Sequence, residues 1–349
     1  MKTLYLTVDP EKLDTPHAIE ALEQAAKILR EGGLVALPTE TVYGLGANAL
    51  DGAAVERIFK AKNRPKWDPV IVHVAEMEML SGIVAEIPQN ARRLMDAFWP
   101  GPLTLLLPRS AAVPDAATAG RPLVGVRMPS HPVALELIRR AGVPIAAPSA
   151  NRFARISPTT AEHVLHDLKG RIDAVLDAGP AQRGVESTVI DPAPSPMIIY
   201  RPGAVTIEQI RKAAGPAEFY KEGAQRADTP QEALPAPGVG LRHYAPKARL
   251  VLVGAPKRQL SARLAAAALD RGDELLGIML PEGIAAPRGI APSRIFAWGK
   301  WDAPEELAQR LYAGLRTLDA AGCSTILCPL PPAEGLGAAL RDRLRKAAR

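Results

Sequence analysis

Residues 16–48, PHAIEALEQAAKILREGGLVALPTETVYGLGAN, contain the alternation that decides the fold. Apolar residues recur at the spacing of one helical face, at Ile19, Leu22, Ala26 and Leu29. Gly32 and Gly33 end that pattern, and a short apolar run at 34–37 follows and stops at Pro38. The stretch therefore predicts a helix over 16–31 and a buried strand over 34–37.

The same alternation continues along the chain. Further strands are expected at 70–74, 103–107, 124–128, 143–147, 174–176, 187–190 and 197–200. Helical spacing is found at 53–60, 89–98, 132–140 and 160–168. Strands that alternate with helices predict an α/β domain with a mixed sheet.

Length and proline content indicate two domains joined by a linker. The chain has 349 residues, more than one typical domain of about 100–200. Its 34 prolines, nearly twice the usual ~5%, exclude an all-helical bundle because proline cannot lie inside helices. Residues 212–246 carry several prolines and no periodicity, which is typical of a linker. Strands and helices then resume, so we expect domains over 1–211 and 247–349, the second a small open α/β sheet.

Composition places the chain among ordinary globular proteins. Hydrophobic residues make up 47% and charged residues 23%. No apolar signal segment opens the sequence and no run of 18 apolar residues occurs, so we expect a cytoplasmic protein. The net charge of +6 suits anionic partners, but an arginine-rich composition without such a partner explains it equally well.

Polar segments follow several of the expected strands. They comprise residues 39–41, Lys62 and Arg64, His73, Arg127, Ser149 and Asn151, Ser187, and Arg201. Singly, each is explained by a capped turn, a solvated helix end or a core histidine. Together they favour an anion-binding site at strand ends, where open α/β sheets usually bind ligands. GLGANA at 44–49 is not a dinucleotide fingerprint, since the strand before it ends at Pro38, and the sequence has no P-loop.

The polar segments also carry a resemblance to a known family. They read PTETVYGLG (38–46), KNRP (62–65), FWPGPLT (98–104), GVRMPSHP (125–132), APSAN (147–151), ESTVID (186–191) and RPG (201–203), followed by APGVGLRHYAPKA (236–248) and EGLGAALRDRLRKAA (334–348). In this order they resemble the threonylcarbamoyl-AMP synthases, in their long form with a YrdC-type domain. The resemblance implies a twisted mixed sheet with a concave basic cleft, followed by a smaller Rossmann-like domain.

The resemblance implies an enzyme that converts L-threonine, bicarbonate and ATP, with Mg²⁺, into threonylcarbamoyl-AMP and pyrophosphate. A tRNA-modifying transferase complex would use the product, and direct contact with tRNA would be weak. The implied threonine-binding residues are Thr41, His73, Arg127, Ala147 through its backbone, and Ser187. The implied ATP-binding residues are Arg64, Asp68, Leu123 through its backbone, Ser149, Asn151, Ser157, Arg201, His243 and Tyr244, the last two closing over the nucleotide. Lys62 and Arg64 would be catalytic, and no residue would bind a metal directly.

Three positions depart from the family's usual residues. Asn63 replaces a glycine, and asparagine tolerates the left-handed backbone that glycine adopts there. Asp68 replaces an asparagine, and Phe153-Ala154 replaces Ser-Gly.

Two other functions compete with that of a synthase. A non-enzymatic basic RNA-binding protein would need aromatic platforms for bases, and only 4% of the residues are aromatic. A carbamoyltransferase-related enzyme would carry C-x-x-C zinc motifs. Cys323 and Cys328 are instead separated by four residues, a C-x4-C spacing that indicates a structural role.

Overall fold

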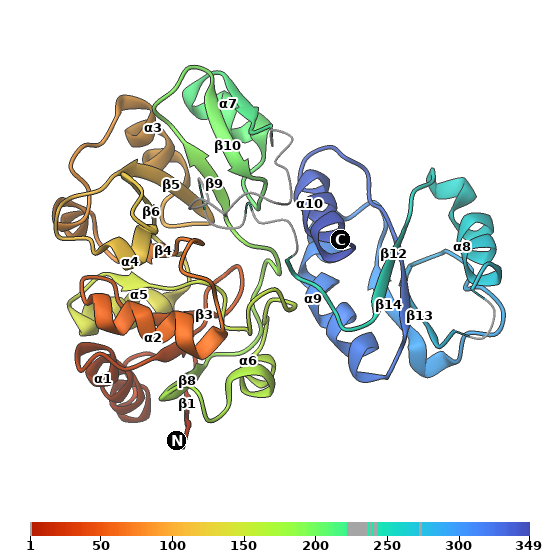
Figure 1. Ribbon diagram of the computed structural model, residues 1–349, viewed down its shortest axis with the longest axis horizontal. Helices are drawn as coiled ribbons and strands as arrows, with labels where there is room; N and C mark the ends of the chain where they lie inside the picture. Colours follow the sequence, from red (N-terminus) through yellow and green to blue (C-terminus); the bar gives the residue numbers. More distant parts are fainter. Residues whose placement is uncertain (1, 222–235, 237–238, 240–242, 272–273) are drawn as a thin grey trace. The chain divides into compact units, whose positions relative to one another are not determined.

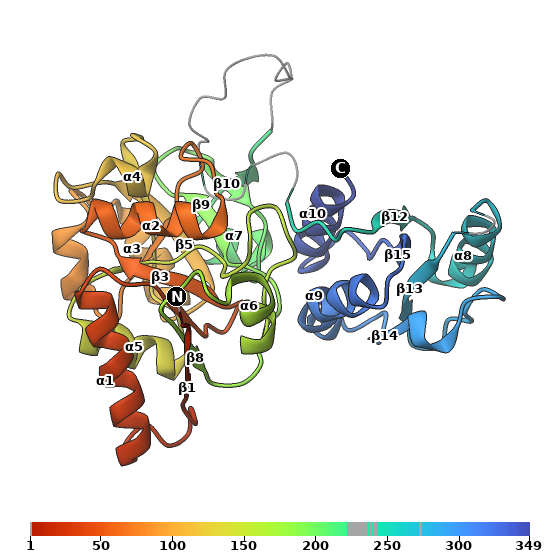
Figure 2. The ribbon, with the colours of Figure 1, turned by 60° about the horizontal axis from the view of Figure 1, so that its bottom comes forward.

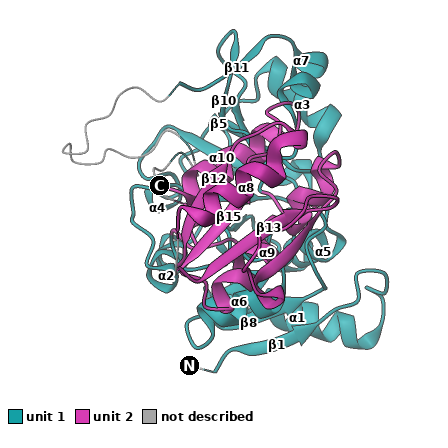
Figure 3. Cartoon of the chain, turned by 90° about the vertical axis from the view of Figure 1, so that its right-hand side faces the viewer, with its two compact units in different colours: residues 1–153, 158–182, 186–240 teal, residues 154–157, 183–185, 241–349 magenta. Residues whose placement is uncertain are grey.

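The computed structural model describes residues 2–221, 236, 239, 243–271 and 274–349. It divides into two compact units, each described by itself below (Figure 3). Unit 1 comprises residues 1–153, 158–182 and 186–240, and unit 2 comprises 154–157, 183–185 and 241–349. The short segments 154–157 and 183–185 thus belong with unit 2, where Arg155 forms a parallel β-bridge with Ala245.

Unit 1 alternates strands and helices along the chain (Figure 1). In order they are β1 (Leu4–Thr7), α1 (Pro16–Arg30), β2 (Val35–Leu37), β3 (Gly44–Asn48), α2 (Gly52–Lys62), β4 (Ile71–His73), the 3-10 helix η1 (Met77–Gly82), α3 (Gln89–Phe98), β5 (Leu103–Pro108), α4 (Asp115–Thr118), β6 (Leu123–Arg127), α5 (Pro132–Ala141), β7 (Ile145–Ala146), α6 (Ala161–Leu168), β8 (Ala174–Asp177), β9 (Thr188–Asp191), β10 (Met197–Arg201), α7 (Ile207–Ala214) and β11 (Ala217–Phe219).

Local chemistry fixes the ends of these helices. Thr15 caps α1, its hydroxyl accepting a hydrogen bond from the backbone N–H of Ala18, and Pro16 begins the helix. Asn63 ends α2 with a φ of 55°, so the left-handed turn predicted at this position is confirmed. The turn matters because it redirects the chain from Lys62 towards Arg64.

The strands of unit 1 form a mixed sheet in the order β1-β8-β2-β3-β7-β4-β6-β5-β9-β10-β11. The mixed sheet expected from the sequence is therefore confirmed. On the back face, alternate residues such as Val72 and Val126 form the main core with α2, α3, α4, α6 and α7. On the opposite side, α1 and α5 pack together over residues of β2, β7 and β8, such as Val35 and Ile145 (Figure 2).

The remaining part of that opposite side carries a different cover. We call it the front face: the side of β4, β5 and β9 that carries Ile71, Leu106 and Val189. Within the described part of the chain, its buried apolar cover consists of two residues from the predicted linker, Ala236 and Val239. A sheet face without a packed helix leaves room for polar side chains.

Unit 2 is a smaller α/β unit whose sheet has the order β12-β15-β13-β14, with parallel pairing throughout. Its elements are β12 (Arg249–Val253), η2 (Lys257–Gln259), α8 (Leu260–Leu269), β13 (Leu276–Pro281), η3 (Pro292–Arg294), β14 (Ile295–Gly299), α9 (Pro304–Ala320), β15 (Thr325–Pro329) and α10 (Gly337–Ala347). The small open α/β sheet expected after the linker is thus present. Cys323 and Cys328 are both buried free thiols here.

The sequence prediction missed several elements and placed the start of the linker too early. Strands β1 and β3 were not expected. The glycines of β3 resemble a turn in the sequence, but the absence of a side chain at Gly46 lets Leu37 and Ile145 pack closely against it. Residues 212–219, expected to lack secondary structure, complete α7 and form β11. The reason is a capping box between Thr206 and Gln209, together with parallel pairing of β11 with β10. The rest of the predicted linker to residue 242 falls mostly outside the described residues.

Candidate active site

Polar side chains from three neighbouring strands gather on the front face. His73 ends β4 and pairs in register with Arg127, which ends β6. Their neighbours Val72 and Val126 point into the back-face core, so His73 and Arg127 point to the front. Thr104 of β5 shares this face, because it alternates with Leu105, which belongs to the back-face core.

Arg127 is held by groups from three segments. Its Nε donates to the carbonyl of Gly101 at 3.1 Å, and its Nη1 donates to the hydroxyl of Thr41 at 3.0 Å. Its Nη2 lies 2.6 Å from Oε1 of Glu40. Arg127, Glu40 and Thr41 are all buried. We call Glu40, Thr41, His73 and Arg127 the Arg127 cluster.

Glu40 is not among the site residues predicted from the sequence. The available signal was Arg127 itself, since an arginine at the end of a buried strand needs a partner, and PTETVYGLG contains an acid. Burial by itself would raise the pKa of Glu40. The charge and hydrogen-bonding capacity of Arg127, aided by the backbone N–H groups of Glu40 and Ser130, outweigh burial and lower it. Glu40 is therefore an ionised partner of Arg127.

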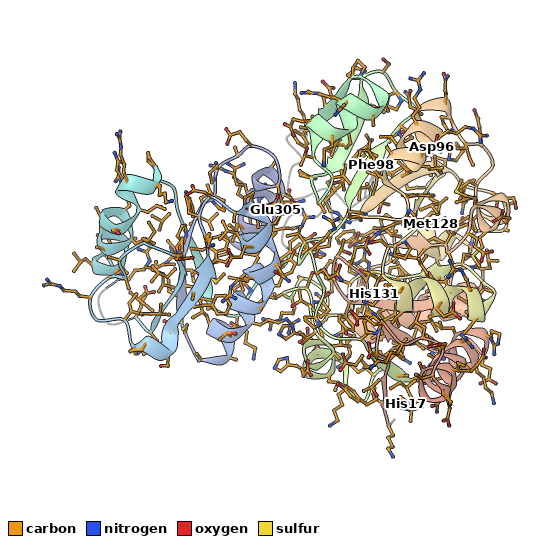
Figure 4. The ribbon with its side chains drawn as sticks, turned by 180° about the vertical axis from the view of Figure 1, so that it is seen from behind. His17, Asp96, Phe98, Met128, His131 and Glu305 are labelled. Atoms are coloured by element: carbon orange, nitrogen blue, oxygen red, sulfur yellow. The ribbon has the colours of Figure 1, made fainter. Side chains whose placement is uncertain are left out.

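Two buried histidines adjoin this ion pair. Burial, and secondarily the charge of Arg127, lowers the pKa of His73 to about 3. Burial also lowers the pKa of His131, against the opposing effect of Glu40. Met128 and His131 lie within unit 1, whereas His17 lies at its rim (Figure 4). Both imidazoles of the site are therefore neutral near pH 7.

Ser187 and Arg201 form a second group beside β5 and β9. The Oγ of Ser187 lies 2.8 Å from Oγ1 of Thr104. Arg201 donates from Nη2 to that Oγ, and from Nε to the carbonyl of Ser187, both at 3.0 Å. Gly203 permits this close approach, because a Cβ there would lie 2.3 Å from the backbone nitrogen of Thr188. Ser187 is thus fixed between a hydroxyl and a guanidinium.

Lys62 is the centre of a separate group, the Lys62 cluster, with Ser149 and Asn151. Its ammonium donates to the backbone carbonyls of both residues and lies 3.5 Å from Oδ1 of Asn151. Burial lowers the pKa of Lys62 well below its usual value, and the nearby Arg64 acts in the same direction. The predicted catalytic lysine is therefore committed to holding the segment after β7.

Arg64 and Asp68 form a buried ion pair close by in sequence. Nη2 of Arg64 lies 2.9 Å from Oδ1 of Asp68, and both side chains are about as buried as the core. Arg64 also donates to the carbonyls of Asp68 and Pro69. The aspartate that replaces the family's usual asparagine is thus the charge partner of Arg64.

The pairing registers separate these groups along the strands. His73 and Arg127 are the last residues of β4 and β6, whereas Ile71 and Leu123 are the first. Ala147 donates its N–H to the carbonyl of Ile71 and so lies at the starting end, where the chain continues to Ser149. The polar groups therefore lie at both ends of these strands, because β7 runs antiparallel to β4. The three residues of β4 span only about 10 Å, so the two ends remain close.

Comparison with known proteins shows which family this chain resembles. The pattern of the family described as "Telomere recombination" matches residues 27–203, and that of "Threonylcarbamoyl-AMP synthase, C-terminal domain" matches 205–349. The threonylcarbamoyl-AMP synthase of Pyrococcus abyssi is 43% identical over 93% of this chain and 92% of its own. The chain belongs to the threonylcarbamoyl-AMP synthase family. The family and the enzyme class expected from the sequence are thereby confirmed.

Other relatives agree with this membership. The threonylcarbamoyl-AMP synthase of Bacillus subtilis is 42% identical over 94% of this chain and 92% of its own. The crystal structure of P. abyssi Sua5 complexed with L-threonine has a TM-score of 0.87 and 40% identity, covering all of this chain and 98% of that one. These relatives support the synthase over the RNA-binding and carbamoyltransferase alternatives.

Three of the residues expected from the family resemblance belong to unit 2. The carbonyl of Ser157 accepts a hydrogen bond from Arg316, and the backbone N–H of His243 donates to the carbonyl of Lys346. The ring of Tyr244 stacks on Tyr312. Their contact with ATP stays a prediction.

The described residues contain no group of three or more His, Cys, Asp or Glu side chains that is placed to hold a metal. Asp68, the carboxylate of the Arg64 pair, is already bound to a guanidinium. These residues therefore do not fit a resident metal centre. Within the same part of the chain, no helix is long and apolar enough to cross a membrane.

Proposed function

We propose that this protein joins L-threonine, bicarbonate and ATP into threonylcarbamoyl-AMP with release of pyrophosphate. A tRNA-modifying transferase complex would then consume the adenylate. The observation that carries the proposal is the Arg127 cluster, where a buried guanidinium shares one sheet face with hydroxyl and imidazole groups. Guanidinium is suited to bind a carboxylate, and the P. abyssi relative has been crystallised with L-threonine.

Threonine is proposed to bind at the ends of β4 and β6. Arg127 receives its carboxylate, and the hydroxyls of Thr41 and Ser187 hold its polar groups. His73 is neutral and offers a hydrogen bond without adding charge. Arg201, which donates to Ser187, orients that hydroxyl.

ATP is proposed to bind near the opposite ends of these strands. Arg64 supplies positive charge to the phosphates, with Asp68 holding its guanidinium in place. Lys62 orders Ser149 and Asn151 rather than contacting phosphate, because its ammonium already donates to their carbonyls. Backbone groups of Leu123 and Ala147 complete the proposed site.

The reaction asks for positioning and charge stabilisation rather than a protein nucleophile. The threonine nitrogen forms a bond to the carbon of bicarbonate or CO₂ and loses a proton, giving a carbamate; starting from bicarbonate, water also leaves. A carbamate oxygen then attacks the α-phosphorus of ATP and the bond to pyrophosphate breaks. ATP enters as its Mg²⁺ complex, so the ion is part of the substrate. The cytoplasmic location remains a prediction.

The test is a direct assay of the purified chain with ATP, L-threonine and bicarbonate. We expect pyrophosphate and threonylcarbamoyl-AMP in equal amounts, and loss of both when threonine or bicarbonate is omitted. The same assay with L-serine in place of L-threonine measures how much the methyl group of threonine contributes to activity. Pyrophosphate release that is independent of threonine would contradict the proposal.

A further inference from the structure

The ion pair inside the Arg127 cluster has a bearing on which ligands the site accepts. Its three ionisable residues are 2% (Glu40), 3% (His73) and 3% (Arg127) exposed, and the adjoining His131 is 6% exposed. Electrostatic energies at such depth depend strongly on the sum of the charges, because an uncompensated buried charge is expensive.

The fixed charges of this site cancel. Glu40 and Arg127 are oppositely charged at a separation of 2.6 Å. His73 and His131 contribute no charge near pH 7, since burial lowers the pKa of each. The charges of the Arg127 cluster and His131 therefore sum to zero before a ligand enters.

Glu40 balances the charge of Arg127 while other segments hold the rest of the guanidinium. Oε1 of Glu40 lies 2.6 Å from Nη2 of Arg127. Nε and Nη1 are occupied by Gly101 and Thr41. A guanidinium carries five N–H donors, so a ligand oxygen can bind beside these contacts.

We propose that Glu40 determines specificity: by cancelling the charge of Arg127, it makes the site select a zwitterionic amino acid over a ligand that carries a carboxylate alone. This rests on the function proposed above and adds to it a reason why an amino acid is required. A zwitterion brings no net charge and leaves the buried sum at zero. A hydroxy acid brings one net negative charge, which the Arg127 cluster does not compensate because Glu40 is already paired with Arg127. Glu40 acts through Arg127 and is a positioning residue.

The experiment is calorimetric titration of the full chain with L-threonine and with 3-hydroxybutyrate, which is threonine without its amino group. The quantity of interest is the ratio of the two dissociation constants. The wild-type chain should prefer threonine strongly. In Glu40→Gln the site gains a net positive charge, so we expect the ratio to shift towards 3-hydroxybutyrate by about tenfold or more.

The matched control is Glu76→Gln, which makes the same change in an exposed pair, where Nε of Arg139 lies 3.2 Å from Oε1 of Glu76. It should leave the ratio unchanged. If wild type binds threonine and Glu40→Gln shows the wild-type ratio, the charge-balance proposal is wrong while the proposed function stands. If the wild-type chain binds neither ligand, both are wrong.

A second measurement needs no variant, which matters because breaking a buried pair risks unfolding the chain. Threonine is titrated into the wild-type chain at pH 7 in two buffers of different ionisation enthalpy. A neutral site that accepts a zwitterion should neither take up nor release protons. Uptake of about one proton per threonine would mean that Glu40 is neutralised on binding, and would overturn the proposal.

Discussion

Arg127 and Lys62 are both buried cations of unit 1, but their surroundings differ. Arg127 is paired with the carboxylate of Glu40, whereas Lys62 donates to the backbone carbonyls of Ser149 and Asn151. Arg127 therefore belongs to a neutral pair that can receive a ligand. Burial lowers the pKa of Lys62, and its hydrogen bonds order the chain around it. The difference separates a binding cation from a structural one.

Removal of Arg127 should have the largest effect. In Arg127→Ala, the substrate loses its guanidinium and Glu40 is left buried without a partner. We expect the activation free energy of threonine-dependent pyrophosphate release to rise by about 3 kcal/mol or more. The free energy of unfolding should fall by a similar amount. Arg57→Ala is the control, since Arg57 pairs with Asp173 at 2.8 Å in a half-exposed position and should cost less than about 1 kcal/mol. Near wild-type turnover in Arg127→Ala would remove the basis of the comparison.

The pH dependence of stability tests the environment of the Arg127 cluster. The pKa of His73 is about 3 in the folded protein, against about 6.5 in the unfolded chain. Below about pH 6.5 the imidazole of His73 is protonated in the unfolded chain, whereas in the folded chain it stays neutral down to about pH 3. The free energy of unfolding should therefore fall as the pH drops through this window. His73→Gln should flatten the fall, measured by urea unfolding from pH 7 to pH 4. His166→Gln, at an exposed histidine, should follow the wild-type curve.

Lys62→Met should show whether the second cation is structural. It leaves the carbonyls of Ser149 and Asn151 without their donor, and we expect a loss of about 2 kcal/mol in the free energy of unfolding. Lys60→Met changes an exposed lysine on the same helix and should be nearly neutral. If Lys62→Met is as stable as Lys60→Met but cannot use ATP, Lys62 acts on phosphate, and the contrast with Arg127 fails.

The smallest expected effect concerns the turn that directs the chain from Lys62 to Arg64. At Asn63, φ is 55°, a conformation that costs alanine about 1 kcal/mol and glycine almost nothing. Asn63→Ala should therefore lower the unfolding free energy by about 1 kcal/mol, and Asn63→Gly should leave it within a few tenths. Equal stability of the two variants would show that the turn is not under strain.

Many residues of the site could be predicted from the sequence, but the groups that they contact could not. Arg127, His73, Ser187 and Lys62 were all recognised from short motifs, and the structure brings Arg127 and His73 together in register. Glu40 was missed because its importance comes from a partner 87 positions along the chain. The role of Lys62 was also predicted differently, since its carbonyl acceptors come from a segment that follows β7.

The sequence by itself determined the helices, most of the strands and the left-handed turn at Asn63, because periodicity, capping and backbone preference act over a few residues. Its ordered motifs also pointed to the family. Only the tertiary structure decided that Glu40 neutralises Arg127, that β7 runs against β4 and separates the polar groups, and that residues 154–157 join unit 2. These features arise where distant segments pack and pair, and a local pattern holds no record of which segments will meet.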